Sequence, residues 1–198
     1  MSPSKPEASA SRPINNAVTA SDWSPGDGEP GLAPYAAAVD RALRLVAELA
    51  RNLIGAHQGA AAMLTAGNWG GARKWFSLSD KYANWFAYRA PAAGVGLHAM
   101  VVDTNAPVRL TQAQVEAHPA YRGFGLESPR HPPMRGWLAV PIVGRDGTNH
   151  GLLQVSDKYN DADFTPDDEA HLTQLAQLTA ITLDALSDTS AGDPSSAS

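Results

Sequence analysis

The stretch HPPMRGWLAVPIVGRDGTNHGLLQVSDKYNDADFTPDDEAHLTQLAQLTAITLDAL, residues 131–186, decides the fold. It contains two apolar runs, Trp137–Val143 and Leu152–Val155, on either side of a turn with Asp146-Gly147 at its centre. Asp-Gly between β-forming runs is typical of a hairpin, because glycine adopts the positive φ of the turn without a Cβ clash. The stretch therefore predicts two antiparallel strands.

A helix is expected directly after this hairpin. Thr165 can cap its N-terminus, Pro166 suits the first helical position, and the three acidic residues 167–169 lie at the positive end of the helix dipole. Further residues recur at steps of three and four and predict one buried stripe: Leu172, Leu175, Leu178, Thr179, Thr182 and Leu186. Hairpin and helix together predict a sheet with one face covered by a helix.

Within the same stretch, Asp157-Lys158, Phe164 and Asp168-Glu169 form a spaced motif. It resembles the Asn-Lys…Phe-x-x-x-Asp-Glu signature of GAF domains, the small-molecule-sensing modules of signalling proteins, with Asp157 in place of Asn. The resemblance implies that Phe164 fills the core and that Asp168 meets Lys158. We expect this pair to be exposed and to orient the elements rather than add much stability, about 0–1 kcal/mol.

The resemblance also implies the fold, an α/β fold of the α+β kind. A central, mostly antiparallel twisted sheet would carry the first and last helices on one face, and short helices with a long loop on the other. We expect one GAF domain at residues 34–187, between disordered tails at 1–33 and 188–198 that are poor in large apolar side chains. In GAF proteins the first and last helices commonly form a homodimer, which we expect here.

The first half of the chain predicts the remaining elements in turn. Apolar residues at helical spacing indicate a helix over Tyr35–Leu53 that Gly55 ends. The other expected elements are strands at Gln58–Thr65 and Trp75–Ser79, a short helix at Asp80–Phe86, a helix at Val95–Asp103, a short strand at Val108–Leu110 and a helical turn at Gln112–Ala117 capped by Thr111.

Composition excludes several functions. The chain of 198 residues has a net charge of −5 and scattered Lys and Arg, which argues against a nucleic-acid partner. It has no cysteine, and therefore no disulfide, no thiolate nucleophile and no Cys-ligated metal. Among GAF proteins, this removes the cysteine-dependent methionine sulfoxide reductases and most bilin-binding members. No apolar run approaches the ~20 residues of a membrane span and no secretory signal is evident, so we expect a cytoplasmic protein without a membrane partner.

The loop His118–Arg135 is the expected lid of a ligand pocket. Its sequence resembles the loop of the haem-binding GAF domains of mycobacterial sensor histidine kinases, which carry His-Pro, Gly-Phe and His-Pro-Pro-Met-Arg. The resemblance implies that His131 would be the proximal iron ligand, and hence the only metal ligand, if haem is bound, with Gln154 at the distal position. His131 could instead serve another pocket role or a structural one.

Six residues are the candidate ligand-binding residues: His131, Gln154, His118, Tyr121, Met134 and Trp75. Trp75 begins an aromatic-rich segment that is either a satellite core or one wall of the pocket. No residue is predicted to be catalytic, because no Gly-x-Ser-x-Gly elbow, phosphate-binding loop or metal-site histidine spacing is present.

The function predicted from these patterns is that of a non-enzymatic regulatory domain that senses a small molecule between the sheet and the 118–135 loop. The identity of the ligand, and of any cofactor, is left open. A haem-based gas or redox sensor is the first alternative and an enzyme with unrecognised pocket chemistry the second. Since no output segment is recognised, we expect that the signal passes to another protein, such as a histidine kinase, or that the chain is one part of a longer architecture.

Overall fold

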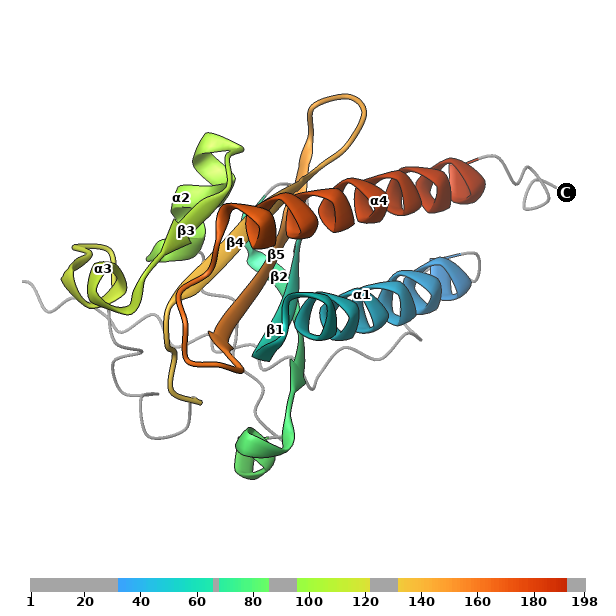
Figure 1. Ribbon diagram of the computed structural model, residues 1–198. Coiled ribbons are helices and arrows are strands. Elements are labelled where there is room, and N and C mark those ends of the chain that lie inside the picture. Colours follow the sequence, from blue (N-terminus) through green and yellow to red (C-terminus); the bar gives the residue numbers. More distant parts are fainter. Residues whose placement is uncertain (1–31, 66–67, 86–95, 122–131, 192–198) are drawn as a thin grey trace, which may run out of the picture.

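A five-stranded antiparallel sheet forms the centre of the molecule, with its strands in the order β2-β1-β5-β4-β3 (Figure 1). The computed structural model describes residues 32–65, 68–85, 96–121 and 132–191. The strands are β1 (Ala56–Thr65), β2 (Asn68–Leu78), β3 (Val108–Leu110), β4 (Trp137–Val143) and β5 (Asn149–Lys158). The expected hairpin is β4–β5, with Gly147 at φ +83° in its turn. The predicted antiparallel sheet is therefore confirmed.

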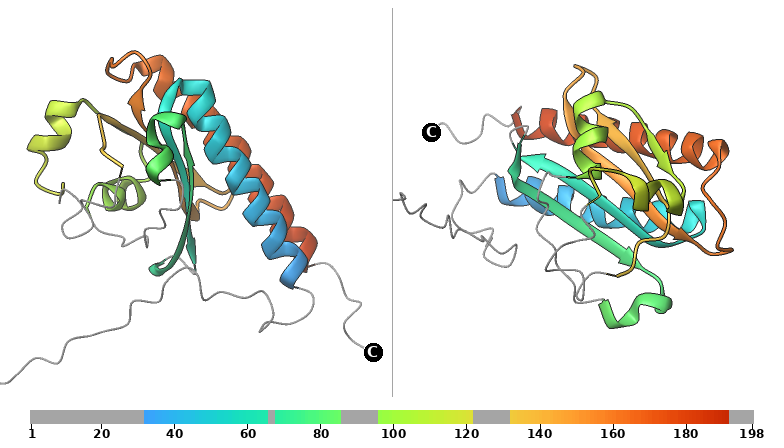
Figure 2. Two further views of the ribbon diagram at one scale, coloured as in Figure 1. Left: turned by 90° about the horizontal axis from the view of Figure 1, so that it is seen from below. Right: turned by 90° about the vertical axis from the view of Figure 1, so that its left-hand side faces the viewer.

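The first and last helices, α1 (Leu32–Ile54) and α4 (Pro166–Ala191), lie side by side on one face of the sheet (Figure 2). They run antiparallel, since the Tyr35 hydroxyl near the start of α1 is 3.2 Å from Ser187 Oγ near the end of α4. Leu43 of α1, Leu172 of α4 and Leu153 of β5 are fully buried in the main core between helices and sheet. The predicted position of the terminal helices is confirmed.

One glycine sets how closely α1 approaches the sheet. A Cβ built at Gly59 would lie 2.5 Å from the carbonyl oxygen of Ala47 and 2.9 Å from Arg51 Cβ. Such distances are shorter than van der Waals contact, so a larger residue at position 59 would push helix and strand apart. The small side chains of Ala47 and Ala50, both fully buried, allow the same close approach from the helix.

The buried stripe of α4 differs from the expected one. Leu172, Ala176, Ala180 and Leu183 face the core, whereas Leu178 is 62% exposed. Leu178 lies two residues from Ala176 and hence about 200° around the helix, on the opposite side. Because Ala176 and Ala180 are small, they bring the helix close to its neighbours, and the larger Leu178 remains outside.

The helix α4 also continues beyond residue 187, where we expected the domain to end. Its last turns are held by an ion pair between Arg145 and Asp188 at 2.8 Å. The Thr189 hydroxyl donates to the carbonyl of Ala185 at 2.9 Å, within the helix. The expected tails lie outside the described residues for 1–31 and 192–198.

Short helices cover the other face of the sheet, as Figure 2 shows. They are α2 (Leu97–Thr104) and α3 (Gln112–Ala117), with the 3-10 helix η1 (Asp80–Trp85) at the end of β2. A second apolar cluster joins this layer to the sheet: Ala62, Leu97, Val101, Val115, Trp137, Ala139 and Leu152. Thr111 caps α3 in a capping box with Gln114, as its spacing predicted.

The strand β2 begins at Asn68, earlier than the predicted Trp75, because β1 pairs with it along its length, from Gln58↔Leu78 to Thr65↔Asn68.

Among the helices that the structure describes, none is both long and apolar enough to cross a bilayer.

Candidate functional site

A hollow opens on the face of the sheet that carries the short helices. Residues alternate along each strand, so Ala60 of β1, Phe76 of β2 and Gln154 of β5 share this face, and Ala60 pairs with both of the others. The small side chain of Ala60 between two large neighbours leaves atom-free space of about 360 Å³, part of it open to solvent. It is lined by Gln58, Gly59, Ala60, Lys74, Phe76, His98, Met134, Gln154, Val155 and Ser156.

Gln154 is oriented by two donors at the floor of this hollow. Its Oε1 lies 2.6 Å from His98 Nε2 and 3.3 Å from Trp137 Nε1. An indole N–H can only donate, so the atom that faces Trp137 must be the amide oxygen. The same oxygen faces His98, and Nε2 of His98 therefore carries a proton and donates it to Gln154.

Lys74 is the cation of the hollow. Its Nζ lies 3.4 Å from His98 Nε2 and 4.8 Å from the centre of the Phe76 ring. Burial lowers the pKa of Lys74 to about 8. The Phe76 ring offers about 0.5–2 kcal/mol of cation–π attraction, which does not replace a hydrogen-bond acceptor. The described residues place no carboxylate within 4 Å of this ammonium.

The rim of the hollow holds the chain that leads into β4. Gln58 Nε2 donates to the carbonyl of Pro133 at 2.5 Å. Ser156 Oγ donates to the carbonyl of Gly136 at 2.9 Å and accepts from the backbone N–H of Arg135 at 3.1 Å. Because Gln58 and Ser156 also line the hollow, a guest molecule there would contact the same side chains that fix residues 133–136.

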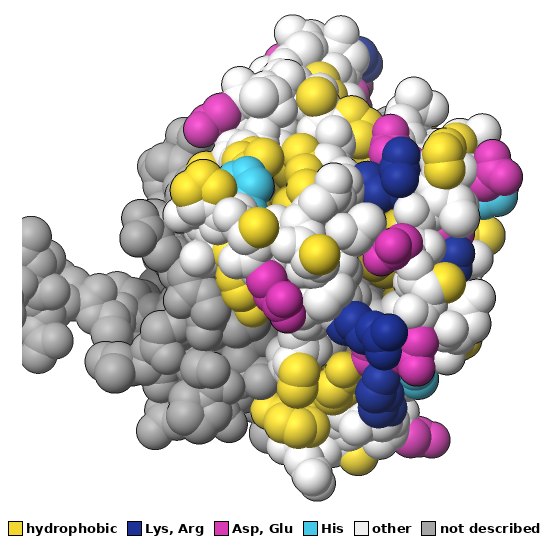
Figure 3. Space-filling model, turned by 60° about the vertical axis from the view of Figure 1, so that its left-hand side comes forward, with side chains coloured by type: hydrophobic (Ala, Val, Ile, Leu, Met, Phe, Trp, Pro, Cys, Tyr) yellow, Lys and Arg dark blue, Asp and Glu magenta, His cyan; other side chains and the backbone are white. Residues whose placement is uncertain are grey.

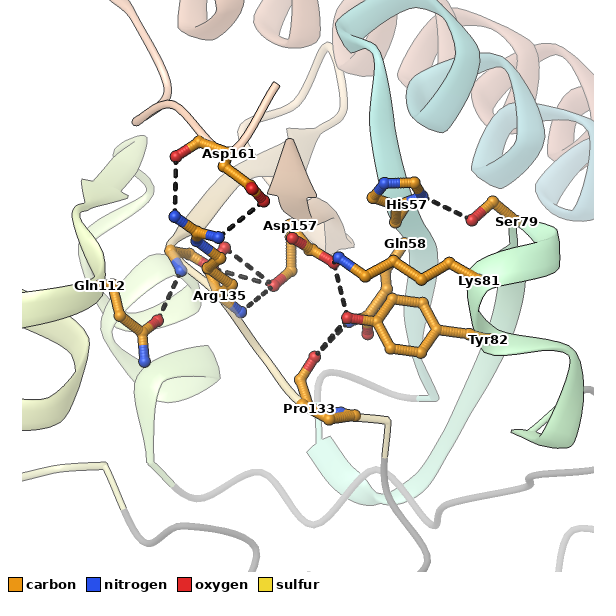
Figure 4. A network of polar contacts seen from close by, with 12 residues as sticks. His57, Gln58, Ser79, Lys81, Tyr82, Gln112, Pro133, Arg135, Asp157 and Asp161 are labelled. Carbon is orange, nitrogen blue, oxygen red and sulfur yellow. Dashed lines mark hydrogen bonds and ion pairs between the residues drawn. The ribbon is translucent and has the colours of Figure 1, made fainter. Parts of the chain in front are cut away.

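A polar network continues from this rim around Asp157 (Figure 4). Asp157 is fully buried, and its Oδ2 accepts from Lys81 Nζ at 2.5 Å and from the Tyr82 hydroxyl at 2.6 Å. Burial and the hydrogen bond to Asp157 raise the pKa of Tyr82. The Asp157 backbone N–H donates to the Arg135 carbonyl at 2.8 Å. Its Oδ1 is buried and receives no hydrogen bond from the described residues.

Two of the predicted site residues, Gln154 and Met134, lie in the hollow. Trp75 lies on the opposite face, where its indole donates to Asp40 Oδ1 at 2.8 Å, because it occupies the strand position between Lys74 and Phe76. The structure therefore does not bring Trp75 to the hollow.

The three loop candidates are not part of the described hollow either. His118 ends α3, and its Nδ1 accepts from the Ala120 backbone at 3.1 Å. Tyr121 packs against the second apolar cluster. His131 lies outside the described residues, so the structure does not test its role.

Sequence reasoning missed Lys74 and His98. The position of Lys74, one residue before the predicted strand Trp75–Ser79, left its face undetermined. His98 was not among the predicted site residues, although it makes the hydrogen bond to Gln154. A strand extended to Asn68 would have placed Lys74 and Phe76 on one face through simple alternation.

The signature pair Lys158–Asp168 is more buried than expected. Lys158 Nζ lies 2.5 Å from Asp168 Oδ2, and the side chains are 16% and 13% exposed. Burial alone would raise the pKa of Asp168, but hydrogen bonds from Lys158 and Thr165 outweigh it and hold that pKa below its usual value. Phe164 is buried beneath the start of α4, as predicted.

Charge on the surface is mixed. On the face seen in Figure 3, Lys and Arg side chains stand beside Asp and Glu and form no continuous basic patch. Two ion pairs of this kind are Arg109–Glu169 at 3.0 Å and Arg135–Asp161 at 2.6 Å. This arrangement lacks the clustered positive charge of a nucleic-acid groove on that face.

Comparison with known proteins identifies the same architecture elsewhere. The family model of the GAF domain matches residues 36–184. The GAF domain of a phosphoenolpyruvate-protein phosphotransferase from Coxiella burnetii has 21% sequence identity and a TM-score of 0.59, over 81% of this chain and 95% of that one. The second GAF domain of DevS from Mycobacterium smegmatis has 20% identity and a TM-score of 0.55, over 76% and 96%.

An enzyme is also among the similar structures. A type II free methionine-R-sulfoxide reductase from Thermoplasma acidophilum has 17% identity and a TM-score of 0.55, over 75% of this chain and 96% of that one. Identities this low establish a shared fold and leave the ligand and the chemistry to the residues of the hollow.

Proposed function

The chain belongs to the GAF domain family, whose members typically sense small molecules or chromophores, and from this membership we propose that it is a non-enzymatic regulatory domain with a small-molecule ligand. The ligand would bind in the hollow between β1, β2, β5 and α2. The observation that supports this most directly is an incompletely filled space with polar side chains, Lys74, His98 and Gln154, at its wall. Mainly apolar hollows with a few placed polar groups are typical of ligand sites.

A ligand in this position would act on residues 133–136. Gln58 and Ser156 line the hollow and also hold this segment by hydrogen bonds at 2.5 and 2.9 Å. From Arg135 the hydrogen-bonded chain continues to Asp157. For binding to produce an output, the ligand must have a higher affinity for one arrangement of this segment than for the other.

The output would pass through α1 and α4 to a second copy of the chain and from there to a signalling partner such as a histidine kinase. Large apolar side chains on the outer surface of these helices support a homodimer: Leu45, Leu49, Leu53, Leu178 and Ile181, each between 44% and 64% exposed. Rows of this size on paired helices are suited to a helical interface.

An enzymatic function has less support. His57 Nδ1 and Ser79 Oγ lie 2.7 Å apart, but the pair does not line the hollow. Among the described residues, no carboxylate is hydrogen-bonded to this histidine to orient it as a base. The chain also has no cysteine to serve as a nucleophile.

The haem alternative has less support as well. The described part of the hollow is small, because its atom-free space of about 360 Å³ includes open solvent, whereas a porphyrin is a large ligand. Gln154, which was expected opposite the iron, is hydrogen-bonded to His98 and Trp137. These two observations favour a ligand smaller than haem.

Binding of fragment-sized probes, observed by two-dimensional NMR of the full chain, tests the proposal. We expect shift changes confined to the backbone amides of residues that line the hollow, such as Ala60, His98 and Gln154. Ala60→Phe should abolish these changes by filling the space, and Met134→Phe should weaken them from the other side. Changes that persist in a folded Ala60→Phe protein, or that cluster elsewhere, would contradict this site.

A further inference from the structure

The hollow contains a cation for which the described residues supply no counter-ion. Lys74 lines the hollow from β2, and within the described part of the chain the only hydrogen-bond partner of its Nζ is His98 Nε2, at 3.4 Å. The described carboxylates that form ion pairs are all engaged with other basic groups. By contrast, Lys81 and Lys158 each reach an aspartate at 2.5 Å.

The one hydrogen-bond partner that the described residues offer Lys74 cannot serve as an acceptor. Trp137 donates to Gln154 Oε1, which fixes the orientation of the amide, and His98 donates its Nε2 proton to the same oxygen. The ammonium of Lys74 thus faces an N–H group. A partly buried ammonium without an acceptor is unfavourable, so a group that accepts hydrogen bonds would complete the site, and one with negative charge would do so most strongly.

We propose that the ligand of the hollow is a small organic monocarboxylate whose carboxylate binds the Lys74 ammonium and whose apolar part lies against Phe76, Met134 and Ala60. This inference rests on the proposed function and names the chemical class of the ligand. One cation matches one negative charge, and the rest of the lining is mainly apolar. A phosphate with two charges would require more donors than one ammonium provides.

A ligand whose carboxylate binds Lys74 would also affect residues 133–136 at the rim of the hollow. The hollow is continuous from Lys74 to Gln58 and Ser156, which hold residues 133–136. A ligand anchored by its carboxylate at Lys74 would direct its apolar end toward Met134 within that segment. The charge would supply affinity, and the body of the ligand would determine which arrangement of the segment is favoured.

The test compares acids with their uncharged amides on the full chain by calorimetry and NMR. The probes are sodium benzoate against benzamide and 3-methylbutanoate against 3-methylbutanamide, with inorganic phosphate as a further anion. We expect each acid to bind the wild-type protein at least tenfold more tightly than its amide. Lys74→Met should reduce this preference to about onefold, whereas Lys158→Met, which removes a lysine remote from the hollow, should retain it.

A second measurement follows the ionisation of Lys74 directly. In a ¹³C-lysine-labelled protein, the Cε resonance of Lys74 should titrate near pH 8 without ligand, and saturating benzoate should move the midpoint upward by at least one pH unit. Lys74→Gln serves as the replacement if Lys74→Met does not fold.

The outcomes separate the two proposals. Equal binding of acid and amide in the hollow would overturn the carboxylate assignment and leave the ligand site itself intact. Tighter binding of phosphate than of either acid, or an acid preference that survives Lys74→Met, would overturn it as well. If no probe changes the chemical shifts of residues in the hollow, both the carboxylate assignment and the ligand site are contradicted.

Discussion

The two faces of the sheet are built from the same strands, and each carries a buried apolar cluster, but only one of them leaves a hollow. On the helical face, Leu153, Leu138 and Trp75 pack against α1 and α4, with 0–4% exposure. On the opposite face, Trp137 and Leu152 pack beneath α2, but the strand residues that line the hollow include the small Ala60 and the polar Lys74 and Gln154. Successive residues along one strand therefore point alternately into the filled core on one face and toward the open hollow on the other.

The difference shows where stability and binding are located. The helical face buries large apolar side chains and leaves no room, which is the main source of stability in a domain of this size. The hollow retains a partly buried amine, to which the described residues offer no acceptor, and an unfilled space, and both lower stability in the absence of a ligand. A binding face of this kind depends on the helical face for its fold.

The largest effect is expected from a cavity on the helical face. Leu172→Ala, at a fully buried position of α4, should lower the free energy of unfolding by about 2–5 kcal/mol in urea denaturation followed by circular dichroism. Met134→Ala, on the side of the hollow, should lower it by less than half as much, because Met134 already borders empty space. Equal losses would show that the two faces do not differ.

The next effect concerns the close approach of α1 to β1. Gly59→Ala would place a methyl group 2.5 Å from the Ala47 carbonyl, and we expect a loss of about 1–3 kcal/mol, measured as a lower Tm by calorimetry. Ala60→Ser, one residue further along β1 and on the other face, is the control, with an expected loss below about 1 kcal/mol. A Gly59→Ala protein as stable as wild type would contradict the close contact.

A pH series should distinguish the buried amine of the hollow. The folded pKa of Lys74 is about 8, against the usual 10.5, so between these pH values the unfolded chain binds a proton that the folded chain does not. Stability therefore rises with pH across this window. Relative to Lys74→Met, the wild-type protein should gain about 1–2 kcal/mol from pH 7 to pH 10.5, less than the full shift because the side chain keeps some exposure. Parallel curves for the two proteins would contradict this.

Lys158→Met provides the matched comparison, since this lysine has a partner. We expect a loss of about 1 kcal/mol at pH 7, because Asp168 loses its ion pair. The pKa of Asp168 is lowered, so its contribution is present above the usual value of 3.8 and is lost as the pH falls through the lowered folded value. The two unfolding curves should converge once the pH has fallen below this lowered pKa. A difference that persists there would indicate lost packing instead.

The smallest effect on stability is expected at the outer surface of α4. Leu178→Gln, at a 62% exposed position, should change the free energy of unfolding by less than about 0.5 kcal/mol. In sedimentation experiments it should shift the protein toward a monomer, whereas the neighbouring Gln177→Ala should not. An unchanged sedimentation coefficient for Leu178→Gln would exclude this surface from the dimer.

Sequence patterns were sufficient for the fold and insufficient for the hollow. Asp146-Gly147, the Thr165 cap and the spacing from Lys158 to Asp168 are local, and each determines an element or its end. The hollow, by contrast, depends on which strand positions share a face across β1, β2 and β5, and thus on register. Lys74 and His98 come from segments 24 residues apart and meet only through the packing of α2 on the sheet.

The contacts of Asp157 predict how two positions of the sequence should vary among homologues. Its carboxylate replaces the Asn of the signature, and the Lys81 ammonium and the Tyr82 hydroxyl both donate to the same oxygen. In homologues that retain Asn at this position, the lysine at position 81 has no carboxylate with which to form an ion pair, and we expect that position to vary. Positions 81 and 157 should therefore covary across the lineage, with acid and base gained or lost together.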